Sequence, residues 1–186
     1  MAMNGTRETE QVWAALDKFQ IEVPSWGFAN TGTRFGKFIQ GGAATSIEEK
    51  FADAAQVNAL TGASPTVALH VLWDLPAGKS DVPGIQALEK KYGVKAGSIN
   101  PNLFQEGAYK HGSIANPSSE IRKKALDHLL DCVEIGRALG SQDISMWIAD
   151  GSNYPGTQSI RKRIVWMEKV FGTMHASLGE GQRMLV

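Results

Sequence analysis

Residues 66–99 read TVALHVLWDLPAGKSDVPGIQALEKKYGVKAGSI, and this stretch decides the fold. The apolar runs at 66–71 and 94–99 each predict a buried strand. Between them, Pro83 suits the first turn of a helix, and the stretch 90–93, Lys-Lys-Tyr-Gly, supplies cations and then a glycine at the helix end. A strand, a helix and a second strand in this order predict an α/β fold with a parallel sheet.

The same alternation continues on both sides of this unit. Ser46-Ile-Glu-Glu49 is a capping box that predicts a helix ending near Thr61-Gly62. A third helix is expected to open at Asn116-Pro117 and to close at Gly140, and a fourth to begin near Ser159. Further strands are predicted at 21–24, at 143–148 and from 184 onward.

Apolar residues at helical spacing predict the faces that these helices bury. The expected core positions are Phe51, Ala55, Leu60, Ile121, Ala125, Leu129, Cys132, Gly136, Leu139, Ile160, Ile164, Met167, Phe171, Met174 and Leu178. Trp13 and Trp166 also lie on predicted helices, where we expect them to pack, and His128 and His175 are assigned to structure. The single cysteine, Cys132, is expected to be a buried and unreactive thiol.

The spacing of the strands predicts only part of a barrel. Successive strands repeat at about 40 residues, so eight such units need far more than this chain supplies. We therefore predict a (β/α)8 TIM barrel of which residues 21–186 form the first four βα units and the start of strand five. Residues 1–20 are predicted to be an N-terminal helical extension.

Charge and hydropathy exclude several classes of function. Lys and Arg number 19, as do Asp and Glu, so the net charge is zero and nothing favours binding to nucleic acid or an anionic membrane. The N-terminus resembles no secretion signal and no run is apolar enough to span a bilayer, so we expect a cytoplasmic protein without a membrane contact. Nucleotide-binding, zinc and serine-hydrolase motifs are not found in the sequence.

Aromatic and polar residues follow the predicted strands, where parallel α/β folds bind their ligands. They are Trp26, His70, Trp73, Asn100, Asn102, Trp147, Asp150 and Asn153. A histidine on an apolar strand is most often a hydrogen-bonded core residue, but Trp73 follows His70 by three positions. An indole offers an apolar surface to the C–H face of a sugar ring while an imidazole takes a hydroxyl or ring-oxygen proton. We therefore predict a sugar site at this end of the sheet.

Other polar residues leave alternatives open. Lys110, in the loop after the third strand, could contact a ligand or be solvated. Asp150 with Asn153 could hold a metal, bind hydroxyls or cap the turn before the fourth helix.

Five blocks of sequence resemble the L-rhamnose isomerase family of the xylose isomerase-like barrels, in the branch with broad aldose–ketose specificity. The blocks, in order along the chain, are Val23-Pro-Ser-Trp-Gly27, Gly32-Thr-Arg-Phe35, Leu69-His-Val-Leu-Trp-Asp74, Tyr109-Lys-His-Gly-Ser113 and Trp147-Ile-Ala-Asp-Gly-Ser-Asn153. The resemblance implies a sugar isomerase that moves hydrogen between C1 and C2 with two divalent cations, usually manganese.

The resemblance also implies roles for individual residues. His70 would contact the sugar's ring or terminal oxygens and assist ring opening. Trp26, Trp73 and Trp147 would form the apolar wall. Phe35 resembles the residue that family members insert into a neighbouring subunit's pocket, which implies a homo-oligomer resembling the family's tetramer.

The chain departs from the family in its metal ligands. Family members take these Glu, Asp and His residues from the fifth strand onward, so no metal ligand is expected in this chain, and the fragment alone is expected to be inactive. A related sugar epimerase is one alternative. Another is a non-catalytic module, because a half-barrel has two open edges and an uncovered interior face that favour association with itself or with the missing C-terminal half.

Overall fold

A computed structural model describes residues 4–29, 41–151 and 158–186, which form one five-stranded parallel sheet. Its strands are paired in chain order and are β1 (Val23–Pro24), β2 (Thr66–His70), β3 (Lys95–Asn100), β4 (Asp143–Ser145) and β5 (Arg183–Leu185). The helices are α1 (Asn4–Leu16), α2 (Ile47–Thr61), α3 (Val82–Tyr92), α4 (Ser119–Leu139) and α5 (Ile160–Ser177), with 3-10 turns η1 (Ser25–Gly27), η2 (Gly78–Asp81) and η3 (Gly107–Tyr109).

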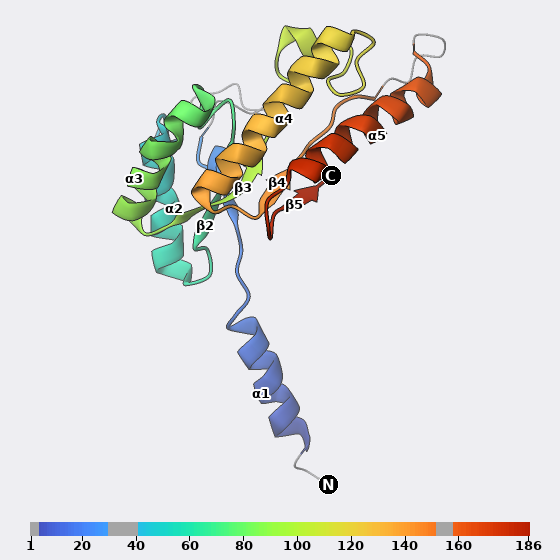
Figure 1. The fold of residues 1–186 in the computed structure, drawn as a ribbon. Helices are drawn as coiled ribbons and strands as arrows, with labels where there is room; N and C mark the ends of the chain where they lie inside the picture. Colours follow the sequence, from blue (N-terminus) through green and yellow to red (C-terminus); the bar gives the residue numbers. More distant parts are fainter. Residues whose placement is uncertain (1–3, 30–40, 152–157) are drawn as a thin grey trace.

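The four helices α2 to α5 alternate with the strands and cover one face of the sheet, whereas α1 projects away from the rest of the molecule (Figure 1). Strands in sequential parallel order with helices on one side form the wall of a β/α barrel. The α/β prediction and the partial barrel are confirmed.

The core lies between the sheet and its helices. From the strands, Val67, Leu69, Ile99 and Ile144 point into it and are fully buried. The helices cover them with the buried residues Phe51, Ala54, Ile85, Ala125, Leu129, Cys132, Ile135 and Met174. Each of these helices therefore packs an apolar stripe on the sheet, which is the arrangement that helical periodicity predicts.

The local signals for helix ends act as predicted. The Ser46 hydroxyl accepts the Glu49 amide at 3.2 Å, and the Glu49 carboxylate accepts the Ser46 amide at 3.1 Å, which completes the capping box. Gly62, Gly93 and Gly140 end three helices at φ values of 68°, 71° and 71°, a left-handed conformation that glycine adopts without steric cost.

Some predicted boundaries are wrong by a few residues. The helix expected to open at Asn116-Pro117 starts at Ser119, because the Asn116 side chain accepts the Ser118 amide and donates to the Gly112 carbonyl, which holds a turn ahead of the helix. The fourth strand ends at Ser145 instead of residue 148, and its last hydrogen bond to β5 runs from the Met146 amide to the carbonyl of Leu185, the last residue of β5.

Four predicted core residues are exposed. Leu60 is 77% exposed in the last turn of α2, and Trp13 is 62% exposed on the projecting α1. Ile160 and Ile164 are 69% and 59% exposed in the first turns of α5. A helix the length of α5 spans about 27 Å, while a three-residue strand spans about 10 Å, so the first turns of α5 extend past the strands beneath it.

The opposite face of the sheet, which would line the barrel interior, carries polar pairs. Alternation along each strand puts Ser98 and Asp143 on this face, away from Ile99 and Ile144. The Glu22 carboxylate accepts the amide and hydroxyl of Ser98 at 2.8 and 2.5 Å. Arg183 donates two hydrogen bonds to Asp143, at 2.8 and 3.0 Å.

Within the described part of the chain, no helix combines the length and apolar character needed to cross a membrane.

Replacing a buried leucine will show that α4 depends on its sheet-facing stripe. We expect Leu129→Ala to lower the free energy of unfolding by about 2–5 kcal/mol, because the truncation leaves a cavity in a fully buried site. The matched control Leu60→Ala should change it by about 0.5 kcal/mol or less, since that side chain is exposed. Urea denaturation followed by circular dichroism measures both, and similar losses would contradict this description of the core.

Candidate functional site

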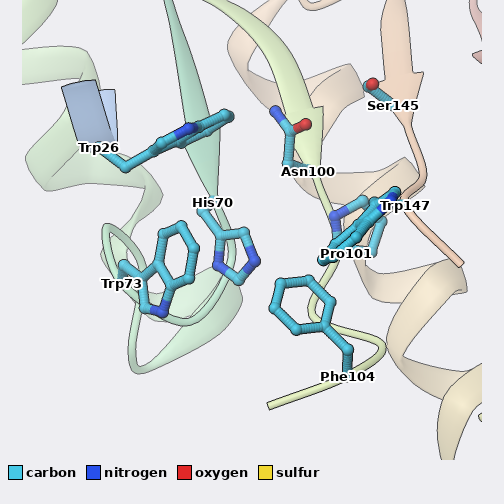
Figure 2. A pocket seen from close by; sticks show the side chains of 8 residues that line it. All are labelled: Trp26, His70, Trp73, Asn100, Pro101, Phe104, Ser145 and Trp147. Atoms are coloured by element: carbon cyan, nitrogen blue, oxygen red, sulfur yellow. The ribbon is translucent and has the colours of Figure 1, made fainter. Parts of the chain in front are cut away.

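A cavity of about 250 Å³ opens at the C-terminal ends of β2, β3 and β4. It is lined by Trp26, His70, Trp73, Asn100, Pro101, Phe104, Ser145 and Trp147, which Figure 2 shows converging from separate strands and loops. Five of the sequence-predicted residues, Trp26, His70, Trp73, Asn100 and Trp147, are therefore brought together. They meet because parallel strands end at a common edge.

Three strand ends position the polar groups of the cavity. His70 is the last residue of β2, and it lies opposite Asn100, the last residue of β3. The Asn100 side-chain amide donates to the Leu69 carbonyl at 3.2 Å, which ties the two strand ends together. Ser145 ends β4, and Trp147 follows two residues later with 44% of its surface exposed.

His70 has an unusual environment for a polar side chain. It is 3% exposed, and neither ring nitrogen has a hydrogen-bond partner among the described residues. The imidazole stacks on Trp73, with ring centroids 3.7 Å apart and planes 16° apart. Burial lowers the pKa of His70 from 6.5 to about 3, with smaller contributions from His128 and Lys50. The ring is therefore neutral near pH 7, with one N–H donor and one acceptor nitrogen.

Aromatic rings surround this imidazole (Figure 2). Trp26 meets His70 edge-on at 6.3 Å and Trp73 at 5.9 Å. Phe104 contacts His70 at 5.9 Å and Trp147 at 4.8 Å. The Trp73 indole N–H donates to the Gln105 side-chain oxygen at 2.6 Å, which joins the loop after β2 to the loop after β3. Apolar ring faces around a few polar groups are suited to a sugar.

Sequence reasoning missed Phe104, which lies in the loop after the third strand. At the start of that loop, only the polar residues Asn100 and Asn102 were predicted to lie at the site. Asn100 lines the cavity, but Asn102 is buried beside α4, where its backbone amide donates to His128 Nε2 at 2.9 Å. An aromatic residue four positions after a strand was the available signal.

Asp150 does not line the cavity and supports the loops beside it. Its carboxylate is buried and accepts the Ser113 amide at 2.8 Å, the Ser113 hydroxyl at 2.6 Å and the Ala115 amide at 2.6 Å. Gly112, at φ 102°, passes so close that a Cβ there would lie 3.1 Å from Asp150 Oδ2. These bonds give Asp150 a structural role in the loop after β3, whereas the structural alternative from the sequence was a cap on the turn before the fourth helix.

Three predicted site residues remain, namely Lys110, Phe35 and Asn153. Lys110 is exposed beside Gly112 and is not among the residues that line the cavity. Phe35 and Asn153 lie outside the described residues. Their predicted roles stay predictions.

Three of the residues assigned to structure, His128, Cys132 and Trp166, lie in structural environments. His128 Nε2 accepts the Asn102 amide, and Cys132 is fully buried, which raises the pKa of its thiol. The guanidinium of Arg122 lies 4.1 Å from the ring centroid of Trp166. His175 is in the last turn of α5, on the exposed side.

The cavity does not fit the divalent cations that the family resemblance implies. Manganese and similar cations take several oxygen or imidazole ligands, carboxylates above all. The residues that line the cavity include no carboxylate, and the described ranges contain no group of three or more His, Cys, Asp or Glu residues that could hold a metal ion.

Comparison with curated proteins finds relatives that are named probable sugar isomerases. The chain is 37% identical over 152 residues to a probable sugar isomerase of Mesorhizobium japonicum, and 34% identical over 176 residues to one of Rhizobium meliloti. The chain is similar to sugar isomerases. These alignments cover 79% and 90% of this chain but 34% and 40% of the relatives, so it spans about two fifths or less of their length. No family model matches the chain.

Solved structures agree on the fold. A D-allulose 3-epimerase from Methylomonas sp. aligns with a TM-score of 0.56 and 16% identity, over 89% of this chain and 50% of the other. A 3-keto-D-glucoside 4-epimerase from E. coli aligns with a TM-score of 0.60 and 12% identity, over 90% and 55%. A xylose isomerase domain protein from Planctomyces limnophilus aligns at 0.52. The chain has the fold of half of a xylose isomerase-like barrel.

The buried, unpartnered imidazole predicts a pH effect on stability. Between about pH 3 and 6.5 the unfolded chain binds a proton at His70 that the folded chain does not, so the wild type loses stability as the pH falls through this range. We expect His70→Phe, which keeps a ring but removes the titrating group, to gain stability relative to the wild type as the pH falls from 7 to 4.5.

Urea denaturation at three pH values measures this difference. The imidazole C–H resonances of His70 should also stay constant in NMR spectra between pH 5 and 8. A stability difference that is the same at every pH, or a His70 resonance that titrates in that range, would contradict the neutral state.

Proposed function

We propose that this chain is the sugar-binding N-terminal part of a metal-dependent aldose–ketose isomerase that acts on L-rhamnose or a related sugar. The observation that carries the proposal is the neutral imidazole of His70, buried without a hydrogen-bond partner in the described residues among rings that line one cavity. The similarity to sugar isomerases supports it.

The cavity offers complementary groups for a monosaccharide. Trp26, Trp73 and Trp147 supply apolar faces against which the C–H side of a sugar packs. Asn100 and Ser145 supply an amide and a hydroxyl at the strand ends. A 6-deoxy sugar such as L-rhamnose carries a methyl group in place of the hydroxymethyl group of other hexoses, and the aromatic side of the cavity favours the methyl group.

His70 is suited to sugar-ring opening, because opening moves a proton from the anomeric hydroxyl to the ring oxygen. A neutral imidazole accepts a hydroxyl proton at one nitrogen and donates N–H from the other. Both nitrogens are buried in this structure, where the imidazole stacks on Trp73 and meets Phe104 edge-on. Neighbouring side chains therefore have to shift before a sugar reaches His70, and the hydrogen bonds that the sugar forms offset the cost of leaving the nitrogens unpaired.

Hydrogen transfer between C1 and C2 needs groups that the described residues do not supply. A divalent cation, when bound, would polarise the sugar's oxygens. We propose that its ligands come from strands beyond β5, in the part of the relatives that this chain does not cover, and that this chain alone binds sugar without converting it.

A sugar epimerase is the second candidate function. The solved structures with this fold include a D-allulose 3-epimerase and a 3-keto-D-glucoside 4-epimerase, which shows that the architecture also hosts epimerases. The cavity described here would serve either reaction, because both need a bound, ring-opened or ketonic sugar.

Association with further protein is also part of the proposal. β1 and β5 are the two edges of the sheet, and no described strand pairs with their outer sides. Unpaired strand edges favour pairing with another chain. We propose that the chain forms a homo-oligomer. Strands of another copy, or of the C-terminal half that this chain does not cover, would complete the barrel wall.

A chimera tests the proposed reaction. The 186-residue chain would be followed by the C-terminal segment of the Rhizobium meliloti relative and assayed with manganese. We expect the chimera to convert L-rhamnose to its ketose and the chain alone to show no turnover. Turnover of other sugars without L-rhamnose would contradict the proposed substrate. With a C2-deuterated aldose, a ketose that carries the label at C1 or has lost it to solvent indicates isomerisation, whereas an aldose product with one inverted centre indicates epimerisation.

Sugar binding by the chain alone can be measured separately. We expect L-rhamnose to change tryptophan fluorescence in a saturable way, and Trp73→Ala to weaken binding about tenfold, since it removes the ring that stacks on His70. The matched control Trp13→Ala removes an exposed indole on α1 and should leave binding unchanged. Tight, stoichiometric binding of manganese in a calorimetric titration of this chain would contradict the proposal that its ligands lie elsewhere.

A further inference from the structure

One buried carboxylate connects the segments that carry Trp26, His70 and Trp73. Asp74 is 2% exposed and follows Trp73 in the turn after β2. Its Oδ1 accepts a hydrogen bond from the Lys50 ammonium on α2 at 2.7 Å. Its Oδ2 accepts the Ser25 hydroxyl of η1 at 2.5 Å and the His70 amide at 2.8 Å.

The partners of Asp74 are adjacent in sequence to the cavity residues. Ser25 directly precedes Trp26, and its hydroxyl reaches across 49 positions of sequence to the carboxylate. The Asp74 amide donates to the His70 carbonyl at 2.9 Å, which closes the turn that carries Trp73. A single carboxylate thus holds the backbone next to Trp26 and the turn that carries His70 and Trp73.

We propose that Asp74, Lys50 and Ser25 are positioning residues of the sugar site, which hold Trp26 at its angle to Trp73 and His70. The three are called the carboxylate brace below. This inference takes its ligand, a monosaccharide, from the proposed function. The geometry of the brace does not depend on that function. The Trp26 and Trp73 rings are 5.9 Å apart at 71°, and they come from segments that share no β-ladder beyond the two residue pairs of β1 with β2.

Stability alone gives a weak reason for the brace. A buried ion pair costs desolvation that its attraction roughly repays, and apolar residues of similar volume often serve as well. The Lys50 and Asp74 side chains are 8% and 0% exposed, so this cost is large here. What an apolar pair would not supply is a set of directed hydrogen bonds to Ser25 and His70.

The spectroscopic test uses the two tryptophans as reporters. Two indoles in close, nearly perpendicular contact give an exciton couplet in far-ultraviolet circular dichroism, and Trp26→Phe establishes that the couplet comes from this pair. We expect Ser25→Ala to reduce the couplet markedly while the helical signal is unchanged, and to weaken L-rhamnose binding about tenfold, as the loss of a hydrogen bond to a charged group implies.

Two further variants keep the test decisive. Asp74→Asn alone would leave Lys50 as a buried, unpaired charge. The double variant Lys50→Met with Asp74→Asn avoids this, and we expect it to lose the couplet as Ser25→Ala does. The matched control is Glu89→Gln, a buried carboxylate on α3 that accepts the Ala96 amide at 2.8 Å away from the cavity. The control should lower stability and leave both the couplet and sugar affinity intact.

The outcomes separate the brace from the proposed function. A folded Ser25→Ala protein with an unchanged couplet overturns the brace, and so does a lost couplet with unchanged affinity. If the wild type binds no monosaccharide, the proposed function fails, while the couplet alone still decides whether the brace positions the rings.

Discussion

The parallel pairing of β2 with β3 is the constraint on which the rest of the site depends. Its register sets His70 opposite Asn100, and the Val71 amide continues the pairing by donating to the Asn100 carbonyl at 2.9 Å. Because both strands run in the same direction, the loops that follow them leave from one edge, which brings Trp73 and Phe104 to the same imidazole. The helices that cover the other face hold this edge in place by burying Leu69 and Ile99.

The buried carboxylates next to the cavity hold the protein's own loops. Asp74 accepts hydrogen bonds from the first and second strand segments, and Asp150 accepts them from Ser113 and Ala115 in the loop after β3. Loop amides removed from water need acceptors, and a carboxylate supplies several at once. The cavity is left aromatic and nearly uncharged. Such a surface suits the neutral sugar of the proposed function, and the proposed isomerase therefore needs metal ligands from elsewhere.

Much of the architecture could be predicted because it is encoded locally. The Ser46–Glu49 capping box and the glycines after three helices act through neighbouring backbone atoms, so their outcome does not depend on distant contacts. The apolar stripes were less reliable. Periodicity states which side of a helix is apolar, but it does not state where the sheet beneath it ends, and Ile160 and Leu60 fall outside the covered area.

From the sequence alone follow the α/β class, the number and order of the strands, and the gathering of Trp26, His70, Trp73 and Trp147 at one edge. These rest on periodicity and on the shared direction of parallel strands. Three features required the folded chain: the desolvated imidazole, the entry of Phe104 into the cavity, and the assignment of Asp74 and Asp150 to loop amides. Each depends on contacts between segments far apart in sequence, and the distance and burial that decide them exist only once the strands are paired.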